Sequence, residues 1–172
     1  MDTLKDRLNS LLSQKVAEEQ SRRNQALEAN KANLAKYAAI LSDYSQFKSA
    51  VELLVSEANS SALAELGYAL ESVFQDAGAV AQYTRFSSMA ENPQIQIPSA
   101  FNIQGRINLS RIGHKPIPTS PALILQFLGQ AARPTVLIQE PRSNRRIQAQ
   151  ISEAGNILSE ELLSFIQRNV TL

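Results

Sequence analysis

The chain of 172 residues contains no cysteine, which excludes disulfides, thiol catalysis and cysteine-based zinc sites. It also lacks tryptophan and has a single histidine. No apolar run approaches the roughly 18 residues that a membrane-spanning helix needs. Asp2 and Asp6 interrupt the basic and then apolar pattern that a leader peptide would show. A soluble cytoplasmic protein without a membrane segment is the simplest interpretation.

Glycine is scarce and scattered, which argues against phosphate-binding loops. The six glycines form no cluster whose backbone amides could cradle a phosphate, and no Gly-x-Ser-x-Gly nucleophile turn occurs. His114 lies beside Gly113 in an expected loop, where only carboxylates could join it as metal ligands. We therefore expect no cofactor, no metal, no catalytic residue and no enzyme activity; a hydrolase that uses His114 is the alternative.

Proline is absent from the first 92 residues, and residues 2–58 contain no glycine either. This stretch is rich in good helix formers and predicts one long helix, or two helices with a joint. Its second half carries apolar residues at alternating steps of three and four, a seam that suits a partner. Asn30 and Lys48 interrupt this seam. The residues that we expect to contact a partner are Leu27, Leu34, Tyr37, Leu41, Tyr44, Val51 and Val55.

A separate apolar stripe begins the same helix and consists of Leu4, Leu8, Leu11 and Leu12. Two shorter helices are expected next, over residues 62–77 and 80–89, with Gly78 ending the first of them. The helix at 62–77 could fold back and cover the seam, which is the alternative to a partner protein. It is only about a third as long as residues 2–58, so that part of the long helix would stay uncovered.

The pattern changes to strand-like alternation after Pro93. Ile95 and Ile97 alternate with glutamines, and residues 101–110 alternate apolar with polar side chains, as in a half-buried strand. Residues 122–128 are expected to form a short buried helix, with a strand as the rival interpretation. Residues 135–139 predict a strand, 141–144 a turn and 145–151 a returning strand, and Ser159 is expected to cap a last helix.

These elements predict an α+β fold. A long helix or helical hairpin, coiled-coil-like, would occupy residues 1–92, and a small α+β domain of order ββαββα would occupy residues 93–172. An internal duplication of a ββα unit is one interpretation of that order. Residues 1–92 carry a net charge of about −3 and residues 93–172 a net charge of about +4, which indicates two different surfaces.

The basic residues of the second half gather at or near an expected hairpin. Arginine suits phosphates, and neighbouring Asn or Gln side chains suit base edges. The absence of Trp and Tyr from this half favours duplex backbone contact over single-strand binding. A solvated basic turn that protects a sheet edge explains the same pattern. The candidate contacts are Arg106, Arg111, Lys115, Arg142, Arg145 and Arg146.

The sequence thus favours a non-enzymatic assembly or adaptor protein. It would form a homo-oligomer, or bind a partner protein, through its N-terminal helices. The alternative is a dimeric nucleic-acid-binding protein that contacts phosphates through the arginine hairpin. No small-molecule substrate is evident from the residues.

Overall fold

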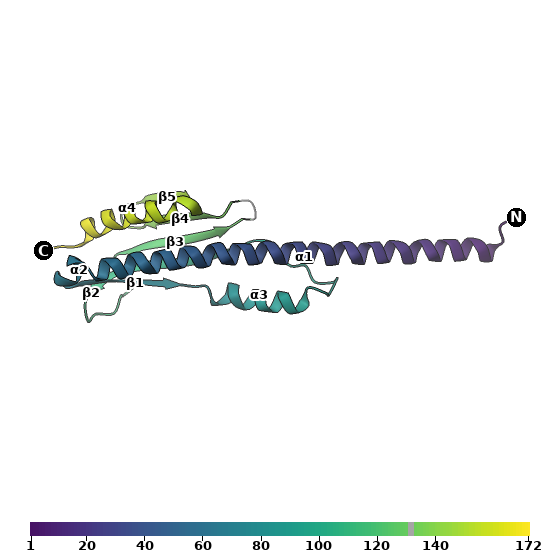
Figure 1. The fold of residues 1–172 in the computed structure, drawn as a ribbon, viewed down its shortest axis with the longest axis horizontal. Coiled ribbons are helices and arrows are strands. Elements are labelled where there is room, and N and C mark those ends of the chain that lie inside the picture. The colour runs from purple at the N-terminus through teal and green to yellow at the C-terminus, as the bar shows by residue number, and fades with distance from the viewer. Residues whose placement is uncertain (131–132) are drawn as a thin grey trace.

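The computed structural model describes residues 1–130 and 133–172 as a helix-and-sheet protein built on one long helix (Figure 1). Five antiparallel strands lie in chain order, β1-β2-β3-β4-β5. The elements are α1 (Leu4–Asn59), α2 (Ala62–Glu65), β1 (Tyr68–Phe74), α3 (Ala77–Met89), β2 (Phe101–Arg111), β3 (Ala122–Gly129), β4 (Thr135–Glu140), β5 (Arg145–Gln150) and α4 (Ile151–Asn169).

The helix α1 is continuous over 56 residues, so it has no joint. A capping box starts it: the Thr3 hydroxyl accepts from the Asp6 amide at 3.2 Å, and the Asp6 carboxylate accepts from the Thr3 amide at 3.1 Å. The helix ends where the Asn59 side chain bonds both backbone groups of Leu70 on β1, at 2.9 and 2.7 Å. Local signals therefore fix both ends of α1.

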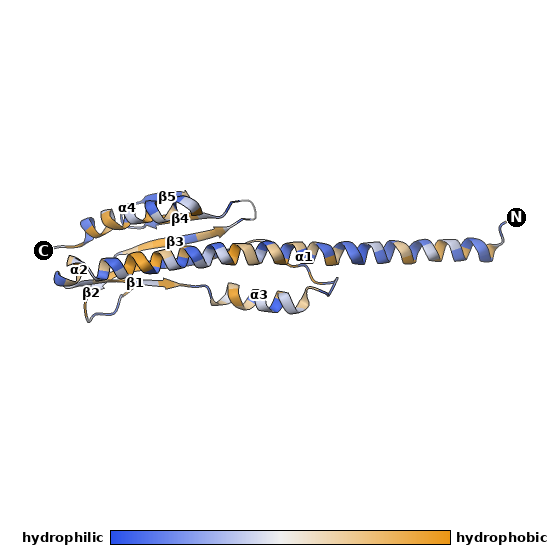
Figure 2. Ribbon diagram, viewed as in Figure 1, coloured by the Kyte–Doolittle hydropathy of each residue, from blue (hydrophilic) through white to orange (hydrophobic). Residues whose placement is uncertain are grey.

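The two parts of α1 have different surroundings. Residues 4–25 are exposed all round and extend beyond the rest of the molecule (Figure 1). From Asn30 onward one side of the helix is buried, first against the segment 90–100 and α3 and then against the sheet and α4. The more hydrophobic turns gather in this second part (Figure 2). The buried residues of α1 are Asn30, Tyr37, Ile40, Tyr44, Phe47, Val51 and Val55.

The core lies between one face of the sheet, α1 and α4. Phe127 of β3 is central, with its ring 5.3 Å from that of Tyr44 and 6.3 Å from that of Phe47. Two glycines allow close approach here. A Cβ at Gly105 would lie 2.5 Å from the Phe74 ring, so glycine here lets this ring pack directly on β2. A Cβ at Gly129 would meet the Ile40 side chain and a backbone carbonyl, both at 2.5 Å.

The helix predicted over residues 62–77 is wrong beyond its first turn. Only Ala62–Glu65 is helical, and Tyr68–Phe74 forms the edge strand β1. Gly67 adopts φ +82°, which ends the helix, because this left-handed conformation cannot continue an α-helix. Pairing of β1 with β2 over seven residues then replaces the local helical preference.

The segment at 122–128 is a strand, as the rival interpretation held. It is β3, the middle strand of the sheet, paired on both sides. The short apolar run reflects burial rather than helical periodicity. The tandem ββα interpretation fails with it, since the only helix after residue 100 in the described chain is α4.

Most of the other sequence predictions are confirmed. The helix at 80–89, the strands at 101–110 and 135–139 and the turn at 141–144 are present, and the strand predicted over 145–151 is present up to Gln150. Residues 94–97 form no strand, and α4 begins at Ile151, eight residues before the expected cap at Ser159. The sheet also crosses the predicted domain boundary, because β1 from the first part pairs with β2 from the second.

Candidate functional site

The seam on α1 is occupied within the chain. Tyr37, Tyr44, Val51 and Val55 are buried against the protein's own sheet, and Leu27, Leu34 and Leu41 are half-buried beside them. The Tyr37 hydroxyl also donates to the Ala79 carbonyl at 2.8 Å. Internal packing therefore uses the apolar surface of this seam. The sheet covers part of it, and α3 covers Tyr37, whose ring centroid lies 6.0 Å from those of Tyr83 and Phe86.

The two polar residues that interrupt the seam each hold another segment in place. The Asn30 amide group donates to the carbonyls of Asn92 and Ile95, at 3.2 and 2.7 Å, and its oxygen accepts from the Ile97 amide at 3.2 Å. The nearby Asn33 side chain donates to the Ile97 carbonyl at 2.9 Å. These bonds fix the irregular segment 90–100 onto α1.

Lys48 and Tyr44 both bind Asp76, which precedes α3. The Asp76 carboxylate accepts from Lys48 at 2.8 Å and from the Tyr44 hydroxyl at 2.7 Å. The hydrogen bond from Lys48, and then that from Tyr44, lowers the pKa of Asp76. The hydrogen bond to Asp76 raises the pKa of Lys48, while burial is the main cause that raises the pKa of Tyr44. All three groups stay in their ordinary charge states near neutral pH, which suits a structural ion pair and not proton transfer.

The apolar stripe at the start of α1 has no partner among the described residues. Its leucines and the following Val16 are 47–75% exposed. At 100° per residue, these side chains fall within an arc of roughly 140° on one side of the helix. We define the stripe as Leu4, Leu8, Leu11, Leu12 and Val16.

A second apolar surface lies at the opposite end of the molecule, where the end of α1, α2 and α4 meet (Figure 1). It is a groove of ≈ 430 Å³. Leu66 and Leu163 on its walls are 42% and 63% exposed. We define the groove by its apolar lining, which is Leu54, Ala58, Ala62, Leu63, Leu66, Leu162, Leu163 and Ile166. Sequence reasoning missed this groove, because it depends on where α4 packs.

The predicted arginine cluster is divided between the two faces of the sheet. Arg145 points to the helical face and pairs with Glu161 of α4 at 2.9 Å, and Arg111 stacks on Tyr68 with 4.4 Å to the ring centroid. Arg106 and Arg146 project from the opposite face, and Lys115 lies exposed in the β2–β3 loop. Residues adjacent on a strand point to opposite faces, so the sequence itself predicts that Arg145 and Arg146 are separated.

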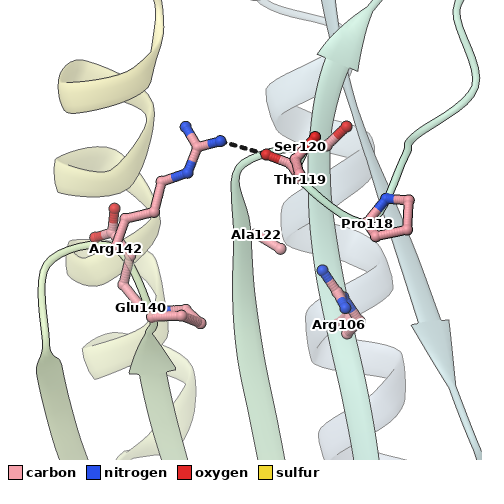
Figure 3. A pocket seen from close by; sticks show the side chains of 8 residues that line it. Arg106, Pro118, Thr119, Ser120, Ala122, Glu140 and Arg142 are labelled. Carbon is pink, nitrogen blue, oxygen red and sulfur yellow. Dashed lines mark hydrogen bonds between the residues drawn. The ribbon is translucent and has the colours of Figure 1, made fainter.

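A polar pocket of ≈ 210 Å³ adjoins Arg106 on the open face, between the β2–β3 loop and the β4–β5 turn (Figure 3). Arg142 reaches across from the turn and donates to the Thr119 carbonyl. The Nε atom of Arg106 is buried and has no hydrogen-bond partner in the described part of the chain. Ser120 and Ala122 complete the side next to β3. The pocket is therefore lined by two arginines and by one acidic residue, Glu140.

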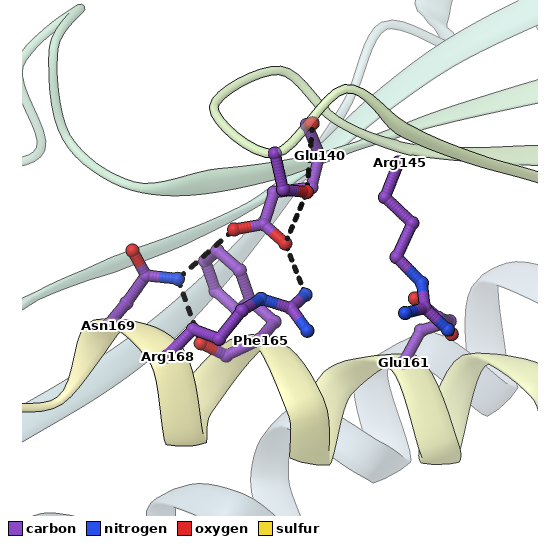
Figure 4. A network of polar contacts seen from close by, with 7 residues as sticks. Glu140, Arg145, Glu161, Phe165, Arg168 and Asn169 are labelled. Carbon is purple, nitrogen blue, oxygen red and sulfur yellow. Dashed lines mark hydrogen bonds and ion pairs between the residues drawn. The ribbon is translucent and has the colours of Figure 1, made fainter.

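The buried acid Glu140 anchors α4 to the sheet (Figure 4). Its carboxylate accepts from Arg168, from Asn169 at 3.2 Å and from the Ser143 hydroxyl at 3.2 Å. Burial alone would raise the pKa of Glu140, but the hydrogen bonds, led by that from Arg168, outweigh it and lower the pKa. Sequence reasoning missed this residue, because two of its three partners, Arg168 and Asn169, lie at the far end of α4.

His114 is exposed in its loop, as expected. Residues 1–130 and 133–172 contain no group of three or more metal-ligating side chains. Within the same residues, none of the helices combines the length and the apolar character that crossing a membrane requires. In comparisons with known proteins, no family model, curated protein or solved structure matches this chain.

Proposed function

We propose that this protein is a non-enzymatic assembly protein that self-associates through the stripe at the start of α1. The observation that carries the proposal is the free first part of α1. Residues 4–25 make roughly 33 Å of helix that covers nothing in the chain, yet this helix presents five large apolar side chains on one side.

Local signals maintain this free helix, so it is not a frayed end. The capping box at Thr3 and Asp6 begins it, and the surface pair Glu19–Arg22 lies along it. Such signals add a few tenths of a kcal/mol to about 1 kcal/mol each. A helix without tertiary contacts is otherwise marginal, and most helical stability in proteins comes from packing of an apolar face. Packing of the stripe against a second copy would supply that contact.

The gain from such packing is modest. Each side chain of the stripe is about half to three-quarters exposed, so burying it contributes about 1 kcal/mol. Five residues then contribute about 5 kcal/mol for each stripe that is covered, before the cost of association. We therefore expect weak, reversible assembly that appears only at high protein concentration, and not a permanent complex.

Sedimentation velocity across a concentration series tests the proposal. The wild type should shift to larger species as concentration rises, and Leu8→Asp with Leu11→Asp should remain monomeric. The matched control is Ser10→Asp with Ser13→Asp, which adds the same charge on the opposite side of the helix and should assemble like the wild type. Unchanged assembly of the leucine double variant, or a wild type that stays monomeric at all concentrations, contradicts the proposal.

Nucleic-acid binding is the second candidate function, and the open face of the sheet favours it. Arg106 and Arg146 lie in one row across that face, about 14 Å apart, with Arg142 at the adjacent turn. Exposed amide side chains surround them, namely Asn102, Gln104, Gln126 and Gln148. Phosphates would meet the arginines, and the amides could contact base edges.

Fluorescence anisotropy of labelled duplex DNA and RNA at several salt concentrations tests this second function. Arg142→Ala with Arg146→Ala should weaken binding and lower the slope of log affinity against log salt by about 2. Arg22→Ala with Arg23→Ala removes the same charge from the free helix and should leave that slope unchanged. Absence of binding at low salt rules out this function.

A further inference from the structure

We infer that the stripe of one copy docks into the groove of the next copy, so that the protein assembles head to tail. This inference rests on the proposed self-association and names the surface that receives the stripe. Both surfaces are apolar, both are open in the single chain, and they lie at opposite ends of the molecule (Figures 1 and 2). A helix with one apolar side is the kind of ligand that an apolar groove between helices accepts.

A chain cannot dock its own stripe. Val16 and Leu54 belong to the same continuous helix and are separated by roughly 57 Å along its axis. The helix has no joint that could bring them together. The occupant of the groove must therefore come from another molecule, and a second copy carries a matching surface.

The charges around the two surfaces are complementary. At 100° per residue, Lys15 falls within the stripe, Lys5 falls near its edge and Arg7 borders it. Asp2 precedes the helix, and the Asp6 carboxylate is held in the capping box on the other side of it. Glu19 falls in line with the stripe, about one turn beyond Val16. The stripe therefore presents apolar and basic side chains.

The groove has an acidic border. Glu57 lines it from α1. Glu160 is exposed and lies next along α4 from Ser159 and close to Leu163, both of which line the groove. Lys5, Arg7 and Lys15 thus supply basic side chains beside the stripe, and Glu57 and Glu160 supply acidic side chains beside the groove. Opposite charges at the rim favour this orientation and speed encounter.

A parallel pairing of two stripes lacks this complementarity. In a parallel pair, Lys15 of one copy would face Lys15 of the other inside the contact, and like charges there are unfavourable. A parallel pair would also leave both grooves uncovered. Head-to-tail docking covers both surfaces, and because it does not pair identical patches, it forms rings or filaments instead of a closed dimer.

Complementation between two defective variants tests the inference. The stripe variant is Leu8→Asp with Leu11→Asp, and the groove variant is Leu66→Lys with Leu163→Lys, all at exposed positions. Each variant alone should be monomeric at 18.9 kDa by light scattering after gel filtration. Their equimolar mixture should form a one-to-one dimer, because one intact stripe meets one intact groove. Affinity at each altered surface should fall on the order of 100-fold.

Assembly of the groove variant at wild-type concentrations would overturn head-to-tail docking and leave the proposed self-association standing. A mixture that stays monomeric although the wild type assembles overturns the inference in the same way. A monomeric wild type refutes both proposals. Far-UV circular dichroism and a melting curve for each variant separate loss of binding from loss of folding.

A charge exchange gives a second test that leaves the apolar residues intact. Glu57→Lys with Glu160→Lys should weaken assembly, and so should Lys5→Glu with Arg7→Glu and Lys15→Glu. Combining both sets in one chain should restore assembly close to the wild-type level, because the opposite charges are matched again. Failure of the combined variant to recover any assembly would contradict the assigned orientation.

Discussion

Replacing Asn30 with alanine should loosen the segment 90–100 and destabilise the whole chain. Asn30 is 2% exposed and makes three hydrogen bonds to the backbone of that segment. Each such bond contributes about 0.5–1.5 kcal/mol net, and alanine leaves two carbonyls and one buried amide without their partner. We expect a loss of about 2–4 kcal/mol, which for a chain of this length lowers the melting temperature by roughly 4–16 °C.

The assay combines urea unfolding with hydrogen exchange of the Ile97 amide. This amide donates to the Asn30 side chain in the wild type. Its hydrogen exchange rate should therefore rise in Asn30→Ala, by a factor that matches the loss in free energy of unfolding. The control is Asn24→Ala on the same helix, whose side chain is exposed and bonds only Gln20. Stability within about 0.5 kcal/mol of that control would refute the reasoning.

Aspartate at the same position refines the test. The Asn30→Asp carboxylate can accept from the Ile97 amide, but it cannot donate to the carbonyls of Asn92 and Ile95. Two carbonyl oxygens would then face a buried negative charge, which raises the pKa of the new carboxyl. A raised folded-state pKa lowers stability progressively as pH rises from the unfolded-state pKa to the folded-state pKa, so the Asn30→Asp deficit should shrink as pH falls through this range. A deficit that does not change with pH would contradict this interpretation of the contact.

The remaining predictions concern glycines and buried acids. Gly129→Ala should lower the free energy of unfolding in urea by about 2–3 kcal/mol, because the new Cβ would meet a backbone carbonyl that cannot move. The new Cβ of Gly78→Ala in α3 meets nothing within 4 Å, so this variant should be more stable by about 0.5–1 kcal/mol. Equal effects of the two substitutions would contradict the assigned packing. Glu140→Gln should cost about 1.5–3 kcal/mol, since α4 loses its buried counter-charge, and melting curves at neutral pH measure this. The folded-state pKa of Asp76 is lowered from 3.8, so its pairing with Lys48 contributes stability above that value, and this contribution is lost as pH falls through the folded-state pKa. Asp76→Asn should therefore lose stability at neutral pH. Below pH 4 its free energy of unfolding should depend less on pH than that of the wild type. An unchanged pH dependence in this acidic range would count against the pair.

The sequence predicted the elements whose patterns are long and local. The 56 residues of α1 lack helix breakers, and β2 alternates over its whole length, so both were predicted. β1 was not, because Leu63, Leu66 and Leu70 follow helical spacing by chance, and its pairing with β2 forms across about 30 intervening residues. β3 was ambiguous, because a strand buried in the middle of a sheet has no alternation to read.

The candidate sites were harder to predict than the elements, since each depends on distant pairing. Asn30 looks like a flaw in an apolar seam when only neighbouring residues are considered, yet its partners lie more than 60 residues away. Lys48 likewise pairs with a residue outside its own helix, Asp76, which lies 28 residues further along the chain. The arginine cluster failed for another reason: strand alternation alone places Arg145 and Arg146 on opposite faces, and grouping them by closeness in sequence ignored that rule.

The polar residues in the seam and the apolar residues in the stripe lead to one conclusion about α1. A helix that served only to dimerise would keep its apolar side continuous and would place its few polar residues where they set register. In this chain the polar interruptions instead bind the protein's own segments, which commits the second part of α1 to folding. The first part makes no such contact, so stability does not require its leucines. Variants of the stripe should therefore change assembly without changing folding, while variants of Asn30 should do the reverse.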